Sequence, residues 1–421
     1  MAAELPSTDI LPGRAAFRAF AYPNYRVWAG GAVVSNVGTW MQRTAQDWLV
    51  LTVLTRNDAS AVGVVMALQF GPQFLLLPWT GAAADRFDRR KLLMATQAVM
   101  GVLALALGLL TIAGEARLWH VQVFAFLFGC AAAFDAPARQ TFVADLVRDE
   151  DLPNAVAWNS TSFNSARMVG PAVAGLCIAA IGTGWAFIAN GASFLAVLAS
   201  LTLLRRGELQ SGGRAARRRG GLVEGLLYVS RRPDLMTILV MLFVIGTFGF
   251  NFSIFIATMA VSVFHASANE YGFLSSFMAV GTVGGALLAT RRNAPRFSLL
   301  ATGSVMFGLG CALGAVAPGY WMFGAALVLT GAASMTVTNV SSSLMQLSTE
   351  PAMRGRVMAL RLAVIAGGTP LGAPIVGWVA DSLGPRWALG VGAASGLLTA
   401  AIGWAYLRRM RRAAPESSAG V

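Results

Sequence analysis

Charged residues are scarce in this chain. Only 12% of its 421 residues are Asp, Glu, Lys or Arg, whereas a soluble domain carries about 25%. The two histidines, His120 and His265, lie far apart and offer neither a metal pair nor a catalytic triad. The sequence also lacks a Gly-Lys-Ser/Thr phosphate loop. These absences argue against a soluble enzyme and against ATP hydrolysis by this chain.

The cysteines and the N-terminal segment indicate neither a metal site nor a leader peptide. The three cysteines, all within apolar runs, are Cys130, Cys177 and Cys311. An odd count without metal spacing identifies them as packing residues. The first 26 residues carry Arg14, Arg18 and Arg26 but no continuous apolar core, which excludes a cleavable signal peptide. We therefore expect an N-terminal tail in the cytoplasm.

Apolar residues make up 56% of the chain. A helix that crosses the bilayer core needs about 20 largely apolar residues, and twelve such runs can be counted. They are 27–54, 62–82, 92–113, 118–140, 156–180, 185–204, 236–263, 271–290, 298–317, 320–345, 357–380 and 386–407. The runs are too long and too uniformly apolar for membrane barrel strands. The sequence thus predicts an all-α integral membrane protein with twelve transmembrane helices.

The basic residues orient these helices. Most of the 32 Lys and Arg lie on the side of both termini, whereas the opposite loops hold only Arg56, Arg117 and Arg386. By the positive-inside rule, we expect a protein of the cell membrane that is surrounded by lipid and has both termini in the cytoplasm. The net charge of +13 does not indicate nucleic-acid binding, because the basic residues lie between apolar segments and not along one face.

The chain divides into two related halves. One constant offset superimposes Gly170 on Gly372, Gly175 on Gly377, Gly182 on Gly384 and Trp185 on Trp387. This repeat predicts two pseudo-symmetric six-helix bundles with a substrate path between them. The expected parts are a tail (1–26), an N-terminal bundle (27–204), a linker with an interfacial helix (205–235), a C-terminal bundle (236–407) and a basic tail (408–421).

The loop between the second and third runs reads GAAADRFDRRKLL, from Gly81 to Leu93. It resembles the signature loop of major facilitator superfamily transporters, whose pattern is filled here by Gly81, Asp85, Arg86, Arg89 and Arg90. The resemblance implies a conformational latch in which Asp85 faces the N-terminus of the eleventh helix, where the helix dipole favours an anion. Arg89 or Arg90 is expected to pair with Asp145. For Arg86 by itself, a solvated positive-inside position is the simpler interpretation.

A second stretch, Phe134 to Gly175, resembles the exporter subfamily that contains the enterobactin exporter and macrolide or multidrug exporters. The residues that carry this resemblance are Asp135, Pro137, Arg139, Gln140, Asn154, Asn159, Arg167, Gly170 and Pro171. Gly170, Pro171 and Gly175 are also similar to a fifth-helix motif associated with antiport, in which Pro bends the helix and Gly permits close contact. Two features depart from the pattern: the fourth run lacks a central Arg, and the second-half loop lacks an Asp.

A polar stripe runs along the first apolar segment: Ser35, Thr39, Gln42 and Gln46 share one face of the predicted helix, and Asn36, Arg43 and Asp47 widen it. The stripe, together with Asn251 of the seventh segment, supplies the candidate cavity-lining residues Ser35, Asn36, Thr39, Gln42, Gln46 and Asn251. Ser253 and Thr258 of that segment are further candidates. Lipid would penalise each of these groups, so we expect the stripe to face a central cavity.

Charged residues inside the spans leave alternatives open. Arg43 and Asp47 are four residues apart and are expected to pair along the helix, either as a structural pair or with Asp47 as the proton-coupling group. Asp135 is expected to pair with Arg167 or with Arg139, as a switch or as a fixed brace. Arg361 would bind an anionic substrate group, bind a carbonyl cluster, or extend to the interface.

These features predict a secondary active transporter. The leading hypothesis is proton-coupled efflux of a small amphipathic organic compound, and the alternatives are a proton-linked nutrient importer and a non-transporting membrane sensor. We expect no catalytic residue, no metal and no cofactor, with the proton gradient as energy source and a functional monomer as the working unit.

Overall fold

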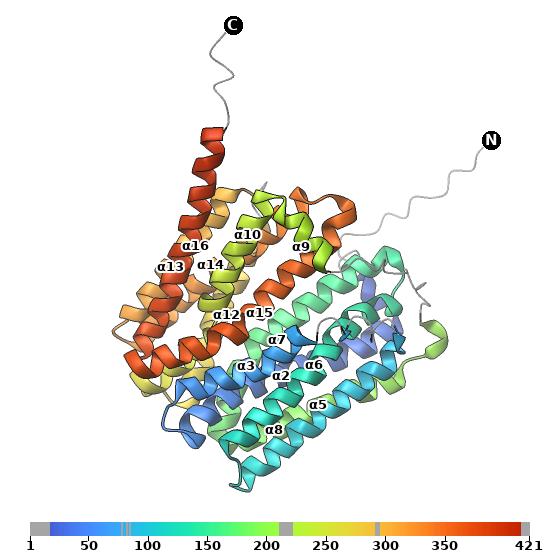
Figure 1. Cartoon of the computed structure of the whole chain (residues 1–421). Coiled ribbons are helices and arrows are strands. Elements are labelled where there is room, and N and C mark those ends of the chain that lie inside the picture. Colours follow the sequence, from blue (N-terminus) through green and yellow to red (C-terminus); the bar gives the residue numbers. More distant parts are fainter. Residues whose placement is uncertain are drawn as a thin grey trace, which may run out of the picture.

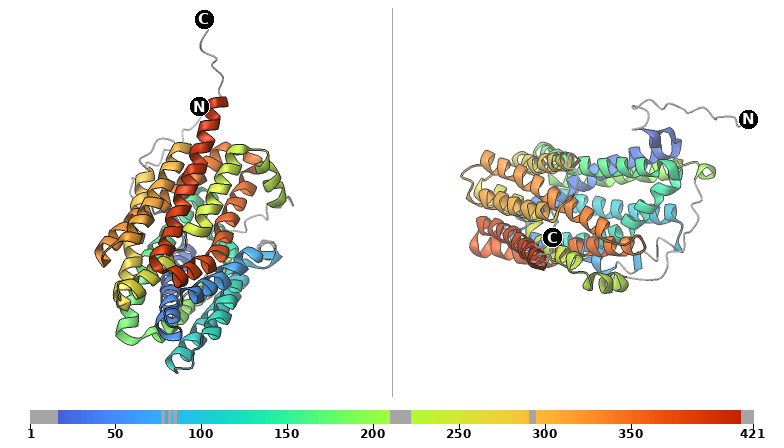
Figure 2. Two further views of the ribbon diagram at one scale, coloured as in Figure 1. Left: turned by 60° about the vertical axis from the view of Figure 1, so that its left-hand side comes forward. Right: turned by 90° about the horizontal axis from the view of Figure 1, so that it is seen from above.

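The computed structural model describes residues 17–76, 79–80, 83, 86–209, 222–290 and 295–413, and regular structure within these ranges is helical. Two groups of long helices lie side by side, the blue-to-green half of the chain against the yellow-to-red half (Figure 1, Figure 2). This arrangement is the predicted pair of helix bundles.

The first bundle contains six long helices and several short turns. They are η1 (Arg18–Ala21), α2 (Pro23–Leu49) with its π-helical extension η2 (Val50–Leu54), α3 (Ala59–Leu75), α5 (Arg89–Ile112), α6 (Leu118–Leu146), η3 (Asp149–Asp151), α7 (Leu152–Ile181), α8 (Thr183–Leu203) and η4 (Arg206–Glu208). The short helix α9 (Leu222–Ser230) follows, where the sequence predicts an interfacial helix. Glu224 of α9 forms an ion pair of 3.1 Å with Arg356 of the second bundle.

The second bundle also has six spans, the first of which is composite. Its elements are α10 (Pro233–Val244), η5 (Ile245–Gly249), α11 (Phe252–Thr258), η6 (Met259–Val263), α12 (Ala268–Thr290), α13 (Phe297–Val316), α14 (Tyr320–Ser348), α15 (Pro351–Leu383) and α16 (Pro385–Ala413). Among the described residues, 10 helices are long and apolar enough to cross a membrane. The polar α2 and the 17-residue α3 pack among them, in agreement with the predicted spans.

The seventh span differs from its prediction. The sequence predicts one helix over 236–263, but the helix is interrupted at Phe250 and Asn251 between the π-helical turn η5 and α11. Gly246 and Gly249 weaken helix formation here, and Gly372 of α15 approaches the carbonyl of Thr247 closely. The Asn251 amide donates to that carbonyl oxygen at 2.6 Å, which stabilises the interrupted backbone.

The internal repeat is visible at two equivalent turns. Gly182, between α7 and α8, has φ of 94°, and Gly384, between α15 and α16, has φ of 103°. Only glycine adopts this left-handed region without strain. The constant sequence offset between these two glycines therefore reflects the same sharp helix–helix turn in both bundles.

Substitution at two glycines of α12 tests this packing. A Cβ atom on Gly281 would meet the backbone of Val328 in α14, whereas a Cβ atom on Gly284 would meet nothing within 4 Å. We expect Gly281→Ala to destabilise the protein by about 1–3 kcal/mol through overpacking. Gly284→Ala should leave the melting temperature in detergent unchanged or raise it, since alanine favours the helix. Equal melting temperatures for the two variants would contradict the packing described here.

Candidate functional site

The two bundles meet along two helix pairs, α3 with α15 and α7 with α12. We call the end of the bundles where α2 begins the terminal face and the opposite end, where α3 and α12 begin, the far face. At the far face a Cβ atom on Gly377 would lie 2.5 Å from the carbonyl oxygen of Ala59, and one on Gly175 would lie 2.6 Å from that of Ala268. Backbone therefore contacts backbone across both pairs, and the far face is closed.

Asp381 reinforces this closure. Its carboxylate, near the end of α15, accepts hydrogen bonds of 2.7 Å from the backbone amides of Ala59 and Ser60, the first residues of α3. The next amide, that of Ala61, donates to Asp58 at 2.8 Å. The first amides of a helix have no partner within the helix and carry its positive dipole end. A carboxylate of one bundle thus caps a helix of the other.

A small cavity of about 80 Å³ lies between the bundles. The first bundle contributes Trp40, Arg43, Thr44, Asp47, Arg167 and Pro171, and the second contributes Phe252, Ser253, Ile256, Tyr271, Ser275, Met278, Ala279 and Thr282. Phe252 and Ser253, which directly follow the interruption at Asn251, line this cavity. All charged groups that line it come from α2 and α7.

The two arginines of the cavity share one aromatic ring. The guanidinium carbon of Arg43 lies 4.6 Å from the ring centre of Trp40, and that of Arg167 lies 5.3 Å from it. Arg43 also lies 5.1 Å from the ring centre of Phe70. Cation–π contacts of this kind stabilise a guanidinium that has lost water.

The expected ion pair between Arg43 and Asp47 does not form. Among the described residues, the ion pairs within 4.0 Å include neither residue. The spacing of four residues permits the pair, but the guanidinium instead lies over Trp40 and Phe70. The carboxylate lines the cavity together with Ser253 and Tyr271 of the second bundle.

The polar stripe of α2 lines the cavity only in part. Arg43 and Asp47 do so, whereas the candidates Ser35, Asn36, Thr39, Gln42 and Gln46 lie against other neighbours, contrary to the expectation. Gln42 accepts a hydrogen bond from Asn190 of α8, and Gln46 donates one of 3.4 Å to Gln69 of α3. Ser35 is buried and Thr39 is half-buried. Because these side chains lie on the flank of α2 that faces its own bundle, the cavity is lined by the other flank, with Trp40, Arg43, Thr44 and Asp47.

Asn251 is also corrected. It is buried and its amide donates to the carbonyl oxygen of Thr247, whereas Ser253 lines the cavity as expected. Thr258 lies in a separate hollow near Asp381 at the far face.

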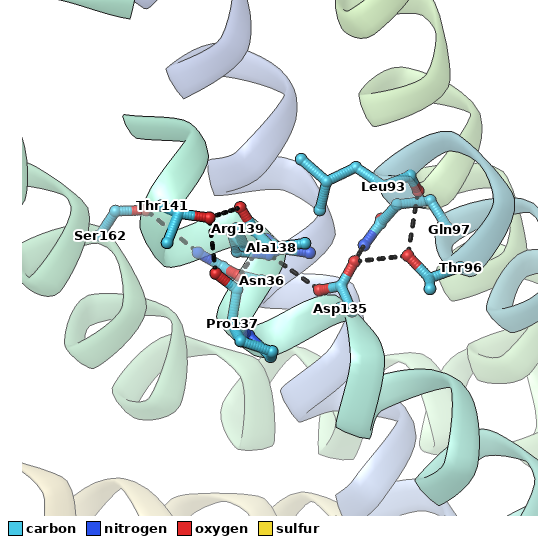
Figure 3. A network of polar contacts seen from close by, with 10 residues as sticks. All are labelled: Asn36, Leu93, Thr96, Gln97, Asp135, Pro137, Ala138, Arg139, Thr141 and Ser162. Carbon is cyan, nitrogen blue, oxygen red and sulfur yellow. Dashed lines mark hydrogen bonds and ion pairs between the residues drawn. The ribbon is translucent and has the colours of Figure 1, made fainter. Parts of the chain in front are cut away.

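Asp135 forms the centre of a buried polar network (Figure 3). It accepts hydrogen bonds from Thr96 at 2.9 Å, from Gln97 at 2.7 Å and from Arg139 at 3.0 Å. Arg139 donates to Asn36 at 3.3 Å, and Asn36 donates to Ser162 at 3.4 Å. The network joins α5, α6, α2 and α7. Of the two predicted partners, Asp135 therefore pairs with Arg139, while Arg167 lines the cavity.

The remaining candidates serve as connections between helices. Arg361 donates to the carbonyl oxygen of Thr338 at 2.7 Å, which is the carbonyl alternative predicted for it. Arg89 forms the predicted ion pair with Asp145 at 2.6 Å, and Arg90 donates to the carbonyl oxygen of Leu201 at the same distance, near the end of α8. Arg86 is exposed. Gly81 and Asp85 lie outside the described residues.

The glycine and proline motif of α7 lies at one contact within the first bundle and at one contact between the bundles. A Cβ atom on Gly170 would lie 2.5 Å from the Cβ atom of Trp40, and one on Gly272 of α12 would lie 2.5 Å from the carbonyl oxygen of Pro171. The motif therefore brings α7 close to α2 and to α12. The helix continues through Pro171 from Leu152 to Ile181.

Three residues of the site were not identified from the sequence: Trp40, Tyr271 and Asp381. Trp40 and Tyr271 resemble ordinary packing residues in an apolar run. Asp381 offered a signal, because it is the single acidic residue of α15 and has no basic residue within one turn.

Two six-helix bundles that meet around a charged cavity define a membrane transporter of the major facilitator fold. The chain belongs to the family of transmembrane secretion effectors within that superfamily, since the family model matches residues 15–419. It is 25% identical over 352 residues to the staphyloferrin A transporter of Staphylococcus aureus, covering 83% of this chain and 87% of that protein. It is 24% identical over 376 residues to macrolide efflux protein A of Streptococcus pyogenes, covering 86% and 90%.

A solved structure supports the fold. A bacterial homologue of the human lysosomal transporter Spinster, in an inward-facing and unoccupied conformation, matches with a TM-score of 0.72 and 16% identity. The match covers 93% of this chain and 98% of that chain. At this identity the likeness establishes the arrangement of the helices alone.

Removal of the Asp135 carboxylate tests the buried network. Asp135→Ala leaves Arg139 as an uncompensated buried charge and removes the acceptor of Thr96 and Gln97, so we expect a loss of about 3–5 kcal/mol in the free energy of unfolding. Glu208→Ala, which breaks the exposed ion pair with Arg205, should cost about 1 kcal/mol or less. Unfolding titrations with SDS in mixed micelles measure both. A loss for Asp135→Ala no larger than the control would contradict the role of the network.

Proposed function

We propose that the protein exports a small amphipathic organic compound across the cell membrane by alternating access, coupled to the proton gradient. In this proposal both termini lie in the cytoplasm, the bundles 27–204 and 236–407 are the moving parts, and segment 205–235 links them. The family of secretion effectors and the relative named macrolide efflux protein A support the direction, and that relative and the staphyloferrin A transporter support a small organic compound as the substrate.

The closed far face beside the charged cavity is the observation that carries this proposal. Backbone contacts and the Asp381 cap close the bundles on that side. Toward the terminal face, polar side chains of α7 are exposed, namely Ser160, Thr161, Asn164 and Ser165. Exposed polar groups at membrane depth favour a water-filled path over lipid. With the termini in the cytoplasm, this state receives cargo from inside the cell.

Export requires the far-face contacts to open. In the described part of the chain, the contacts there are three hydrogen bonds to Asp381, from the amides of Ala59 and Ser60 and from the Ser60 hydroxyl, together with backbone packing at glycines. In our proposal Asp47 of the cavity carries the coupled proton, since it is the carboxylate that lines the cavity without an ion-pair partner. Arg43, Arg167 and Asp47 then form the part of the path where cargo and proton are exchanged.

Efflux measurements in cells test this function. Overproduction in a drug-sensitised bacterial host is expected to lower the accumulation of at least one compound in a panel of macrolides, dyes and siderophore-like carboxylates, and a protonophore should restore accumulation. Asp47→Asn should reduce coupled efflux at least tenfold, while Glu208→Gln at an exposed position should have no effect. Unchanged accumulation of every compound with correctly inserted protein would overturn the proposal.

Asp381 gives a separate test of alternating access. Asp381→Ala leaves the first amides of α3 without their acceptor, which typically costs about 0.5–2 kcal/mol and shifts the population toward a state open at the far face. We expect a cysteine at Ala268, the residue against Gly175, to react several times faster with an impermeant maleimide in a background without the native cysteines. Glu115→Ala, in an exposed turn of the far face, is the control. Equal labelling rates in the two variants would contradict the role of Asp381.

A further inference from the structure

The charges of the central cavity are not balanced. Its lining contains two guanidinium groups, those of Arg43 and Arg167, and one carboxylate, that of Asp47. The facing helices of the second bundle contribute no charged residue to the lining: α11 provides Phe252, Ser253 and Ile256, and α12 provides Tyr271, Ser275, Met278, Ala279 and Thr282. The lining therefore has an excess of one positive charge at membrane depth, where a charge without a partner is costly.

Two buried hydrogen-bond donors of the cavity have no partner. The Nε atom of Arg43 and the Nε1 atom of Trp40 are buried and make no hydrogen bond. Neither arginine forms an ion pair within 4.0 Å among the residues that the structure describes. Buried donors of this kind normally have an acceptor. Trp40 and Arg43 of α2 and Arg167 of α7 thus place donors around one small space, and they have no acceptor among the described residues.

The ring of Trp40 holds both guanidinium groups in place. Both lie within cation–π distance of it, at 4.6 Å and 5.3 Å. This contact compensates for part of the lost water but supplies no negative charge. Arg361 provides a comparison within the same protein, because its guanidinium donates to the carbonyl oxygen of Thr338. The Nε atom of Arg361 also has no partner, but its guanidinium has acceptors in the protein, whereas no hydrogen bond of Arg43 or Arg167 is found among the described residues.

We propose that Arg43 and Arg167 form a binding subsite for the carboxylate of the transported compound, which makes an amphipathic organic acid the substrate class. This inference rests on the proposed transport function. A carboxylate accepts hydrogen bonds from guanidinium groups in a planar, bidentate manner. The cavity volume of about 80 Å³ equals the share of roughly two or three water molecules, so in this state the subsite holds the head group alone. Phe252, Ile256 and Met278 offer apolar contacts to the adjoining part of the molecule.

Matched head groups test the subsite. Purified full-length protein in phosphatidylcholine nanodiscs, which carry no anionic lipid, is titrated with phenylbutyrate, 1-naphthylacetate and 1-pyrenebutyrate, and with the amide and the amine of the same skeletons. Dissociation constants are measured by thermophoresis. We expect at least one carboxylate to bind tenfold or more tightly than its amide, and the amines to bind most weakly. If no carboxylate binds more tightly than its amide, or if the amines bind best, the proposal is overturned.

Arginine variants locate the effect. Arg43→Gln and Arg167→Gln should each remove most of the preference for carboxylate, and the double variant should remove all of it. The lysine variants keep the charge but lose the planar donors, so they should retain part of the preference and serve where a glutamine variant does not fold. Arg386→Gln, at a residue that donates to the carbonyl oxygen of Ala315, should keep the preference. A preference that survives in the double variant would refute the subsite.

Transport in proteoliposomes separates this inference from the proposed function. If a carboxylate binds through the two arginines but is never moved, the transport proposal fails and the subsite stands. If the double glutamine variant exports neutral or cationic compounds at the wild-type rate, the transport proposal stands and the carboxylate subsite fails. Export of the carboxylate by the wild-type protein, with a loss of at least tenfold in the double variant, supports both.

Discussion

Lipid supplies no partner to a charged group, so every charge in the spanning part of this protein depends on what the protein places beside it. Asp135 is satisfied by three donors, and Arg361 by a backbone carbonyl. Arg43 and Arg167 differ, since they lie over the faces of aromatic rings and have no carboxylate within 4.0 Å in the described structure. Both arginines line the cavity where the two bundles meet, which is the place where we propose that cargo binds.

Glycine sets the geometry of that meeting. Gly175 and Gly377 occupy equivalent positions in the two halves, and each lies against the first residue of a helix in the opposite bundle, Ala268 and Ala59 respectively. The repeat in the sequence therefore corresponds to a repeat of contacts between the bundles. Close backbone packing of this kind holds helices together without strong polar bonds, as the alternating access that we propose requires.

The spans were predictable within a few residues, because the thickness of the bilayer fixes the length of an apolar run. The direction of the α2 side chains was not. The stripe includes the consecutive residues Gln42 and Arg43, which point in directions about 100° apart around the helix axis. Only the positions of α8, α3 and α12 decide which of these two flanks meets the cavity. The interruption at Asn251 was likewise missed, since its cause is the approach of α15 to Thr247.

The sequence by itself determined that the chain crosses a membrane in two related bundles, that Arg89 or Arg90 is suited to pair with Asp145, and where glycine permits turns and close contacts. Only the tertiary structure decided that Asp135 pairs with Arg139 whereas Arg43 does not pair with Asp47, although both pairs have the same spacing. It also brought Asp381 to the amides of Ala59 and Ser60, more than 320 residues away. Local spacing sets which side chains can reach one another, but competing partners from distant helices determine which contacts form.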